Sequence, residues 1–314
     1  MRVATNSYTN TMLNEFSSLK QQQINLQNQV ATGLSVQAPS DNPEAMETTL
    51  DDLSSQATQQ QYSSNITTAQ AQANSVYSVL QSLQSITSQA KTITTEAGSG
   101  TNSQTDLNNY ASQVTSLIQQ AVALVNTQDP ATGQYLFGGT NSGQQPFTAT
   151  TDANGNVTGV TYQGNSSVNQ TQVSSGTSVA VEVPGANTSG SGAYGLITDS
   201  RTGADLFNNL IQLQQNLSSG NTSAVTTTDS KNIQNDEDNM TYQVANNGNV
   251  QAQLDTASSL ASTQTTALGN DVTNASGADL VNTLTKLNQV QTAYQAALES
   301  STTIMQLSLI DFMT

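Results

Sequence analysis

Both ends of the sequence carry long runs in which apolar residues recur at alternating steps of four and three. Near the N-terminus the series starts at Met12 and reaches Val30, with one polar member at Gln23. At the other end it starts at Leu280 and reaches Phe312. This is the heptad spacing of helices that pack along a narrow seam. Because a seam needs a facing helix, the simplest packing places the first and last helices together.

The first helix is separated from the next by a short segment with two prolines. Gly33 is well placed to end the first helix, because glycine readily adopts the left-handed conformation found there. Asp41 or Asn42 can cap the following helix, and Pro43 suits its first turn. We predict that this second helix carries a heptad seam from Tyr62, which slips by one three-residue step after Leu83 and continues to about Ala97. A Gly-Ser-Gly stretch then interrupts the pattern.

Helical spacing returns three more times in the interior. It covers residues 107–124 and 206–217, and a long, very polar helix is expected over about 226–272. Between the first two of these, short β-prone pieces such as Val157–Tyr162 and Ser178–Val183 alternate with turn residues. These pieces predict a small antiparallel domain inserted between helices.

The predicted fold is therefore mainly α. It is a long antiparallel helical-bundle or coiled-coil stem built from both chain ends, with a small inserted antiparallel β domain. We expect three parts. Residues 1–45 and 275–314 are terminal coiled-coil assembly segments that are loose in the monomer, 46–134 and 201–274 form a helical stem domain, and 135–200 form the β domain.

The composition excludes much of the usual enzyme chemistry. Among 314 residues, 34% are apolar and 9% charged, with 20 Gly and 5 Pro and no His, so about half of the chain is Ser, Thr, Asn or Gln. Without Cys there is no thiol nucleophile, disulfide or thiolate metal site. Without His there is no Ser-His-Asp triad or histidine zinc site. We predict no enzyme activity, no cofactor and no metal.

The charge and hydropathy exclude two classes of partner. Six basic against 22 acidic residues give a net charge of −16, and the basic residues are scattered, so we expect no nucleic-acid partner. The longest apolar run, Ala121–Val125, is far shorter than a membrane span, so no membrane partner is expected. The first residues show no apolar core of a secretory signal peptide, so we expect no cleaved signal.

Two polar motifs allow more than one interpretation. The segment Asp152–Asn156 resembles the opening of a calcium loop, but Val157 and Gln163 stand where such a loop needs Gly and Glu, so a hairpin turn is favoured. The acidic run Asp236–Asp238 is interpreted as a solvated helix face, with an interlocking or cation contact as the alternative.

Three regions of the chain carry short motifs whose order is informative. Residues 33–45 read GLSVQAPSDNPEA after the N-terminal heptad helix, and residues 133–140 read GQYLFGGT before the β insertion. The third region, near the C-terminus, reads QTAYQAA over 291–297 and QLSLIDF over 306–312. Their order, spacing and placement at the chain ends make the combination specific. In this combination the chain resembles the flagellin superfamily, and within it the hook–filament junction family.

The resemblance implies a structural role in the bacterial flagellum. A closed ring of about eleven copies would join the hook, through the hook-side junction protein, to the flagellin filament. The resemblance also implies type III export without a cleaved signal, an extracellular location, and a cytosolic export chaperone at the C-terminal helix.

We expect the terminal seams to pack between copies as the assembly interface. The alternative is that they form an ordinary intramolecular coiled coil. The residues that we expect to form the assembly interface are Met12, Phe16, Leu19, Leu26, Val30, Leu284, Leu287, Tyr294, Leu298, Met305, Leu309 and Phe312.

Three other functions stay open at this stage. The nearest alternative is flagellin itself, the main filament subunit. A glycan-binding or adhesive module in residues 135–200 is a second, although the lack of Trp argues against sugar stacking. An enzyme would need paired carboxylates in that domain, where Asp152 and Glu182 are the only acids between Asp129 and Asp199.

Overall fold

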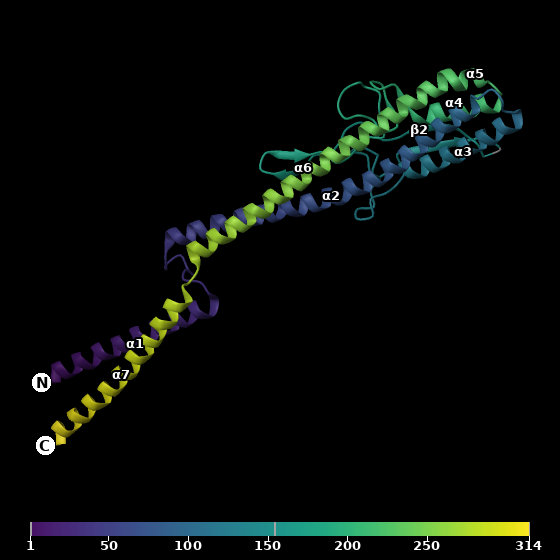
Figure 1. Cartoon of the computed structure of the whole chain (residues 1–314). Coiled ribbons are helices and arrows are strands. Elements are labelled where there is room, and N and C mark those ends of the chain that lie inside the picture. The colour runs from purple at the N-terminus through teal and green to yellow at the C-terminus, as the bar shows by residue number, and fades with distance from the viewer. Residues whose placement is uncertain (1, 154, 314) are drawn as a thin grey trace. The chain divides into compact units, whose positions relative to one another are not determined.

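The chain forms two compact units (Figure 1). Unit 1 comprises Met1–Thr58 and Thr263–Thr314, and unit 2 comprises Gln59–Ser262. The computed structural model describes residues 2–153 and 155–313, with side-chain surroundings for 10–153 and 155–303. The three-part division expected from the sequence stays a prediction.

Long helices account for most of the chain, so the predicted mainly α fold is confirmed (Figure 1). Two of them, α2 and α6, each contribute residues to both units. The helices are α1 (Arg2–Thr32), α2 (Pro43–Ala97), α3 (Gln104–Val125), α4 (Leu206–Ser218), α5 (Thr222–Ala224), the π-helix η1 (Val225–Asp229), α6 (Ser230–Ser276) and α7 (Leu280–Met313).

The proline-containing segment forms the connection between α1 and α2. Gly33 ends α1 at a φ of 71°, as predicted. Of the two candidate caps, Asn42 caps α2, because its Oδ1 accepts the backbone N–H of Ala45 at 3.2 Å. Asp41 instead accepts the backbone N–H groups of Gln37 and Ala38, which lower the pKa of its carboxyl.

The predicted seam of α2 is the centre of the core of unit 2. Its first part steps by four and three, then slips by one three-residue step after Leu83, and the members on both sides of the slip are buried. These buried members are Ile66, Ala69, Ala73, Val76, Leu80, Leu83, Ile86, Ala90, Ile93 and Ala97.

Helix α6 also carries a heptad seam, but polar residues occupy part of it. From Asp229 of η1 onward, buried positions follow at steps of four and three through Ile233, Asp236, Met240 and Gln243. The polar members make specific bonds; the Gln243 amide, for example, donates to the carbonyl of Tyr194 at 3.1 Å. Buried polar groups with partners are tolerated in a core, and this is how so polar a helix packs.

The solvated face expected for the acidic run 236–238 is wrong at its first residue. Asp236 is fully buried. Glu237 forms an ion pair with Lys91 on α2, with Oε2 2.5 Å from Nζ, and Asp238 is exposed. Three consecutive acids on a helix necessarily point in three directions, so one solvated face cannot hold all of them.

The β insertion consists of three small sheets. Strands β1 (Phe147–Thr151) and β2 (Val157–Tyr162) form an antiparallel hairpin, as do β3 (Thr171–Ser174) and β4 (Thr177–Val179). In the third sheet, two-residue strands β5 (Ala186–Asn187), β6 (Thr198–Asp199) and β7 (Ala204–Asp205) follow in that order, with β5 and β6 parallel.

One predicted strand is shorter than expected. The pattern over 178–183 forms a ladder only as far as Val179. Val181 and Val183 are nevertheless buried, in two different clusters of the core of unit 2. The alternation of apolar residues therefore marks a segment that packs its side chains without continuing the backbone pairing.

The segment Asp152–Asn156 is a hairpin turn, as favoured from the sequence. Asp152 accepts the backbone N–H of Asn156 through its Oδ1 at 2.9 Å, and Gly155 has a φ of 83°. The turn connects β1 to β2.

The motif at residues 133–140 holds the insertion against the helices. Leu136 and Phe137 are buried, and the Phe137 carbonyl accepts the N–H of Gly185 at 2.9 Å. Gly139 has a φ of 61°, and a Cβ there would lie 2.2 Å from the carbonyl oxygen of Asn165. Only glycine fits this position without displacing the backbone.

A partly buried ion pair closes the loop before β6. Arg201 donates from Nε and Nη2 to the two carboxylate oxygens of Asp199, at 2.9 and 2.6 Å, and its guanidinium lies 3.6 Å from the ring centre of Tyr194. Burial opposes ionisation of Asp199, but the Arg201 side chain and the N–H groups of Gly195 and Arg201 outweigh it and lower its pKa.

Core packing in unit 2 predicts a contrast between two leucines of α2. Leu83→Ala removes a fully buried side chain and is expected to lower the free energy of unfolding by about 2–5 kcal/mol. Leu50→Ala, at a side chain that is 54% exposed in unit 1, serves as the matched control and should change it by less than about 0.5 kcal/mol. Urea unfolding of the dilute chain measures both, and equal effects would contradict this picture of the core.

Candidate assembly surface

Unit 1 is built around the pairing of α1 with α7, which lie side by side (Figure 1). Phe16 of α1 and Tyr294 of α7 meet edge to face, with ring centroids 5.7 Å apart and an interplanar angle of 77°. This geometry is the favoured one for aromatic pairs. The first and last helices therefore do pack on each other, as the simplest packing required.

The two connections next to this pair are joined by backbone hydrogen bonds. Leu34 and Gly277 form an isolated antiparallel bridge. The N–H of Ser35 donates to the carbonyl of Ser276 at 2.7 Å, and the N–H of Ala278 donates to the carbonyl of Gly33 at 2.8 Å. The conformation at the start of the motif at 33–45 is thus coupled to the connection between α6 and α7.

The predicted interface residues of α1 all lie on one partly buried stripe. Met12, Phe16, Leu19, Leu26 and Val30 are half-buried, as is the polar member Gln23. None of these side chains is fully buried, so the α1–α7 pair alone leaves part of each accessible.

The predicted residues of α7 differ in their exposure. Leu287 and Tyr294 are half-buried, whereas Leu284 and Leu298 are 46% and 43% exposed. The side chains of the three remaining predicted residues, Met305, Leu309 and Phe312, lie outside the described part. That these residues form an assembly interface stays a prediction.

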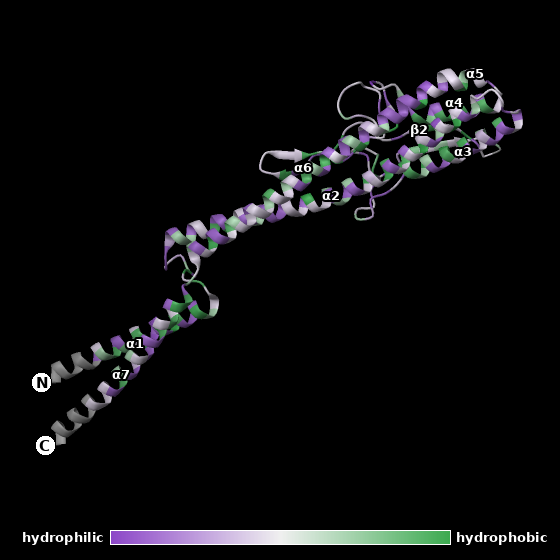
Figure 2. Cartoon of the chain, in the orientation of Figure 1, coloured by the Kyte–Doolittle hydropathy of each residue, from purple (hydrophilic) through white to green (hydrophobic). Residues whose placement is uncertain are grey.

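Exposed apolar side chains concentrate on unit 1. In the described part of the chain, nine of the eleven exposed large apolar side chains belong to unit 1, and Tyr242 and Leu260 are the two in unit 2. The buried apolar side chains show the reverse, since Val36 is the only one of them in the described part of unit 1. Figure 2 shows apolar residues recurring along the described turns of α1 and α7. Unit 1 therefore pairs apolar stripes without enclosing a core.

Sequence reasoning missed some of this surface. Leu13 and Ile24 on α1, and Val281 on α7, are exposed but fall outside the predicted seam. Leu13 and Ile24 are eleven residues apart, which places them on one side of a helix after three turns. This second apolar stripe was the available signal.

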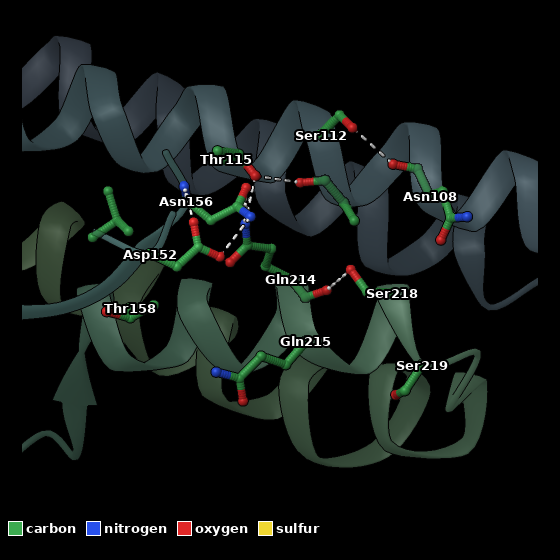
Figure 3. Close-up of a pocket in the computed structure, with 12 residues that line it drawn as sticks. Asn108, Ser112, Thr115, Asp152, Asn156, Thr158, Gln214, Gln215, Ser218 and Ser219 are labelled. Carbon is green, nitrogen blue, oxygen red and sulfur yellow. Dashed lines mark hydrogen bonds between the residues drawn. The ribbon is translucent and has the colours of Figure 1, made fainter. Parts of the chain in front are cut away.

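Unit 2 contains a pocket of about 590 Å³ between α3, α4 and the β1–β2 turn (Figure 3). Gln214 crosses it to donate to Thr115, and Asn156 faces the same space. The lining is mostly hydroxyl and amide groups, with Asp152 the one carboxylate, whose Oδ2 accepts from the Asn156 amide.

The described residues contain neither a cluster that could hold a metal ion nor a membrane-spanning helix. Among them, acidic side chains nowhere gather in a group of three or more that could hold a metal ion. No helix in the same part of the chain is long and apolar enough to span a membrane.

The N-terminal part of the chain matches a known family. Residues 3–142 match the bacterial flagellin N-terminal helical region, which covers α1, α2 and α3. The resemblance to the flagellin superfamily is confirmed. A comparison with curated proteins finds no match.

Solved structures share the fold. A flagellar hook-associated protein of Vibrio parahaemolyticus is 19% identical with a TM-score of 0.63, over 76% of this chain and 100% of that one. FlgL of Xanthomonas campestris is 17% identical with a TM-score of 0.56, over 69% and 98%. FlgL of Bacillus cereus is 19% identical with a TM-score of 0.55, over 70% and 97%. The chain thus shares its fold with these hook-associated proteins over nearly their full length.

The aromatic contact in unit 1 predicts the effect of a single substitution. Tyr294→Ala should weaken the α1–α7 pairing by about 1 kcal/mol or more, because it removes the ring that meets Phe16. Tyr294→Phe keeps that ring and is the matched control. Thermal melting followed by far-UV circular dichroism should show an early loss of helix for the alanine variant. Identical melting of both variants and the parent protein would contradict the contact.

Proposed function

We propose that this protein is a structural component of the bacterial flagellum that forms the junction between hook and filament. The observation that carries the proposal is the unequal distribution of apolar surface, buried in unit 2 and exposed on unit 1. A unit that pairs two apolar stripes without a core gains stability when further copies cover them. The shared fold of hook-associated proteins supports the placement at the hook.

The mechanism is geometric rather than catalytic. Helices α1 and α7 of neighbouring copies pack through their predicted interface residues into a tubular layer, and unit 2 supplies an independently folded body. Small or polar seam members such as Gln23, Gln291 and Ser301 permit looser packing than a continuous leucine seam. A junction has to fit two differently packed neighbours, and such adaptable contacts suit that task.

The partners and location follow from the same proposal. The protein assembles with itself as a closed ring of about eleven copies, with the hook-side junction protein on one side and flagellin on the other. A cytosolic chaperone holds the C-terminal helix before export, and the assembled protein lies outside the cell. No nucleic acid, membrane, cofactor or enzyme activity enters this function.

A deletion strain of the source bacterium tests the junction role directly. The expected phenotype is intact hooks without filaments, with unpolymerised flagellin recovered from the medium. Restoration by the plasmid-borne parent gene is the control. Normal filaments in the deletion strain would overturn the proposal.

Flagellin itself is the second candidate, because the matched family region is that of flagellin. Purified flagellin grows into long filaments, whereas a junction protein is expected to stop at short assemblies. Electron microscopy of the concentrated protein separates the two, and long filaments of this chain alone would favour flagellin.

The interface predicts a substitution that separates folding from assembly. Leu298→Asp places a charge on an exposed apolar side of α7 and should abolish filament formation in the complemented strain while unit 2 keeps its urea midpoint. Leu260→Asp is the matched control, since Leu260 is 46% exposed but lies in unit 2. It should leave assembly intact. Removal of the last ten or so residues should act like Leu298→Asp, and filaments nucleated by either altered interface would refute the account.

A further inference from the structure

Two carboxyl groups are buried where α4 packs against η1 and α6, and each faces an asparagine of α4. Asn209 donates its amide to Oδ2 of Asp236 at 2.9 Å, and Asn216 donates to Oδ2 of Asp229 at 2.8 Å. The two asparagines are seven positions apart in sequence, and so are the two aspartates. The two pairs therefore repeat along an antiparallel arrangement of helices. We call these two pairs the Asp–Asn seam.

Apolar side chains enclose the seam. Leu213 of α4 and Ile233 of α6, which lie between the two pairs in sequence, are both fully buried, as are Asp229 and Asp236 themselves. Transfer of an ionised carboxylate into such surroundings is strongly unfavourable unless a cation accompanies it.

Asp236 also fixes the start of α4. Its Oδ1 accepts the backbone N–H of Asp205 at 2.8 Å, and the Asp205 side chain itself makes no capping bond to that helix. The bond ties β7 and the first turn of α4 to α6. Ionisation of Asp236 therefore affects β7, α4 and α6.

Neither the burial of Asp236 nor the charged groups near it favour an ionised carboxylate there. Desolvation is the main cause that raises the pKa of Asp236 to about 7; the Asn209 and Asp205 hydrogen bonds oppose it, and the nearby Asp205 carboxylate adds to it. The cation of the adjoining loop, Arg201, is paired with Asp199. Glu237, the next residue on α6, faces away to Lys91.

The pKa of Asp229 is also raised, and one of its oxygens gives a further reason for it to stay protonated. Its Oδ1 is buried without a hydrogen-bond partner, and desolvation raises the pKa of the carboxyl against the single Asn216 bond. An unpartnered buried oxygen is more easily tolerated on a neutral acid than on a carboxylate.

We propose that the Asp–Asn seam is a pH-dependent latch, closed when its carboxyls are protonated and loosened at α4 and β7 when Asp236 ionises. The sign follows from proton binding. Below about pH 4 both folded and unfolded chains hold the proton, and between there and pH 7 only the folded chain does, so stability falls as pH rises through this window. Above it, no further loss is expected.

The composition makes this latch unusually easy to observe. The chain has no His and no Cys, so the side chains that ordinarily titrate near neutral pH are absent. Asp41, Asp106 and Asp199 have lowered pKa values, and therefore titrate in acid, outside the window.

The test is urea unfolding of the dilute full chain at pH 5, 6, 7 and 8. The unfolding equilibrium constant of the parent protein should rise up to about tenfold per pH unit between pH 5 and 7 and then level off. Asp236→Asn should remove most of this rise, because the amide stays neutral and can still bond to a flipped Asn209. Asp238→Asn is the matched control, an exposed residue of the same helix, and should keep the parental profile.

Several outcomes would overturn the latch. A parental profile that is flat or that gains stability from pH 5 to 7 contradicts it, as does a rise that persists undiminished in Asp236→Asn. If the unfolding constant of Asp238→Asn also fails to rise with pH, the effect comes from the overall charge of the protein and not from Asp236. If Asp236→Asn fails to fold, carbon-13 NMR of the parental Asp carboxyls decides, since a carboxyl that titrates near pH 7 is required. The assay uses monomer, so it stands or falls independently of flagellar assembly.

Discussion

The structure depends on how heptad seams are covered. In unit 2 the seam of α2 is enclosed by the rest of the unit, and its members from Ile66 to Ala97 are buried. In unit 1 the seams of α1 and α7 find one another through contacts such as Phe16 with Tyr294, but their apolar residues stay half-buried or exposed. The same sequence pattern thus gives a self-sufficient body in one unit and an incomplete pair in the other, and the incompleteness is the basis of the proposed assembly.

Helix α6 shows that a seam need not be apolar. Asp229, Asp236 and Gln243 occupy heptad positions and are buried with partners chosen from α4 and from backbone carbonyls of the insertion. Such a seam is specific, because each polar group requires its own partner at one register. The proposed pH response is a consequence of this choice, since carboxyls fill the polar positions nearest α4.

Much of the fold was readable from the sequence, and the exceptions have physical causes. The α2 seam, the Gly33 end of α1 and the turn at Asp152–Asn156 depend on local rules of spacing and backbone conformation. The burial of Asp236 was not readable, because its partners Asn209 and Asp205 are far away in sequence and polar themselves. On α7 the apolar stripe is wide, so spacing alone did not decide that Leu284 and Leu298 would be exposed while Leu287 is half-buried.

The central claim is that unit 2 is stable alone and that unit 1 is completed by other copies. Hydrogen exchange followed by mass spectrometry, on the dilute monomer and on the assembled protein, tests it most directly. Amides of α1 and α7 should exchange quickly in the monomer and become protected on assembly, while those of α3 and α4 are protected in both. Equal protection of α1, α7 and the unit 2 helices in the monomer would contradict the account.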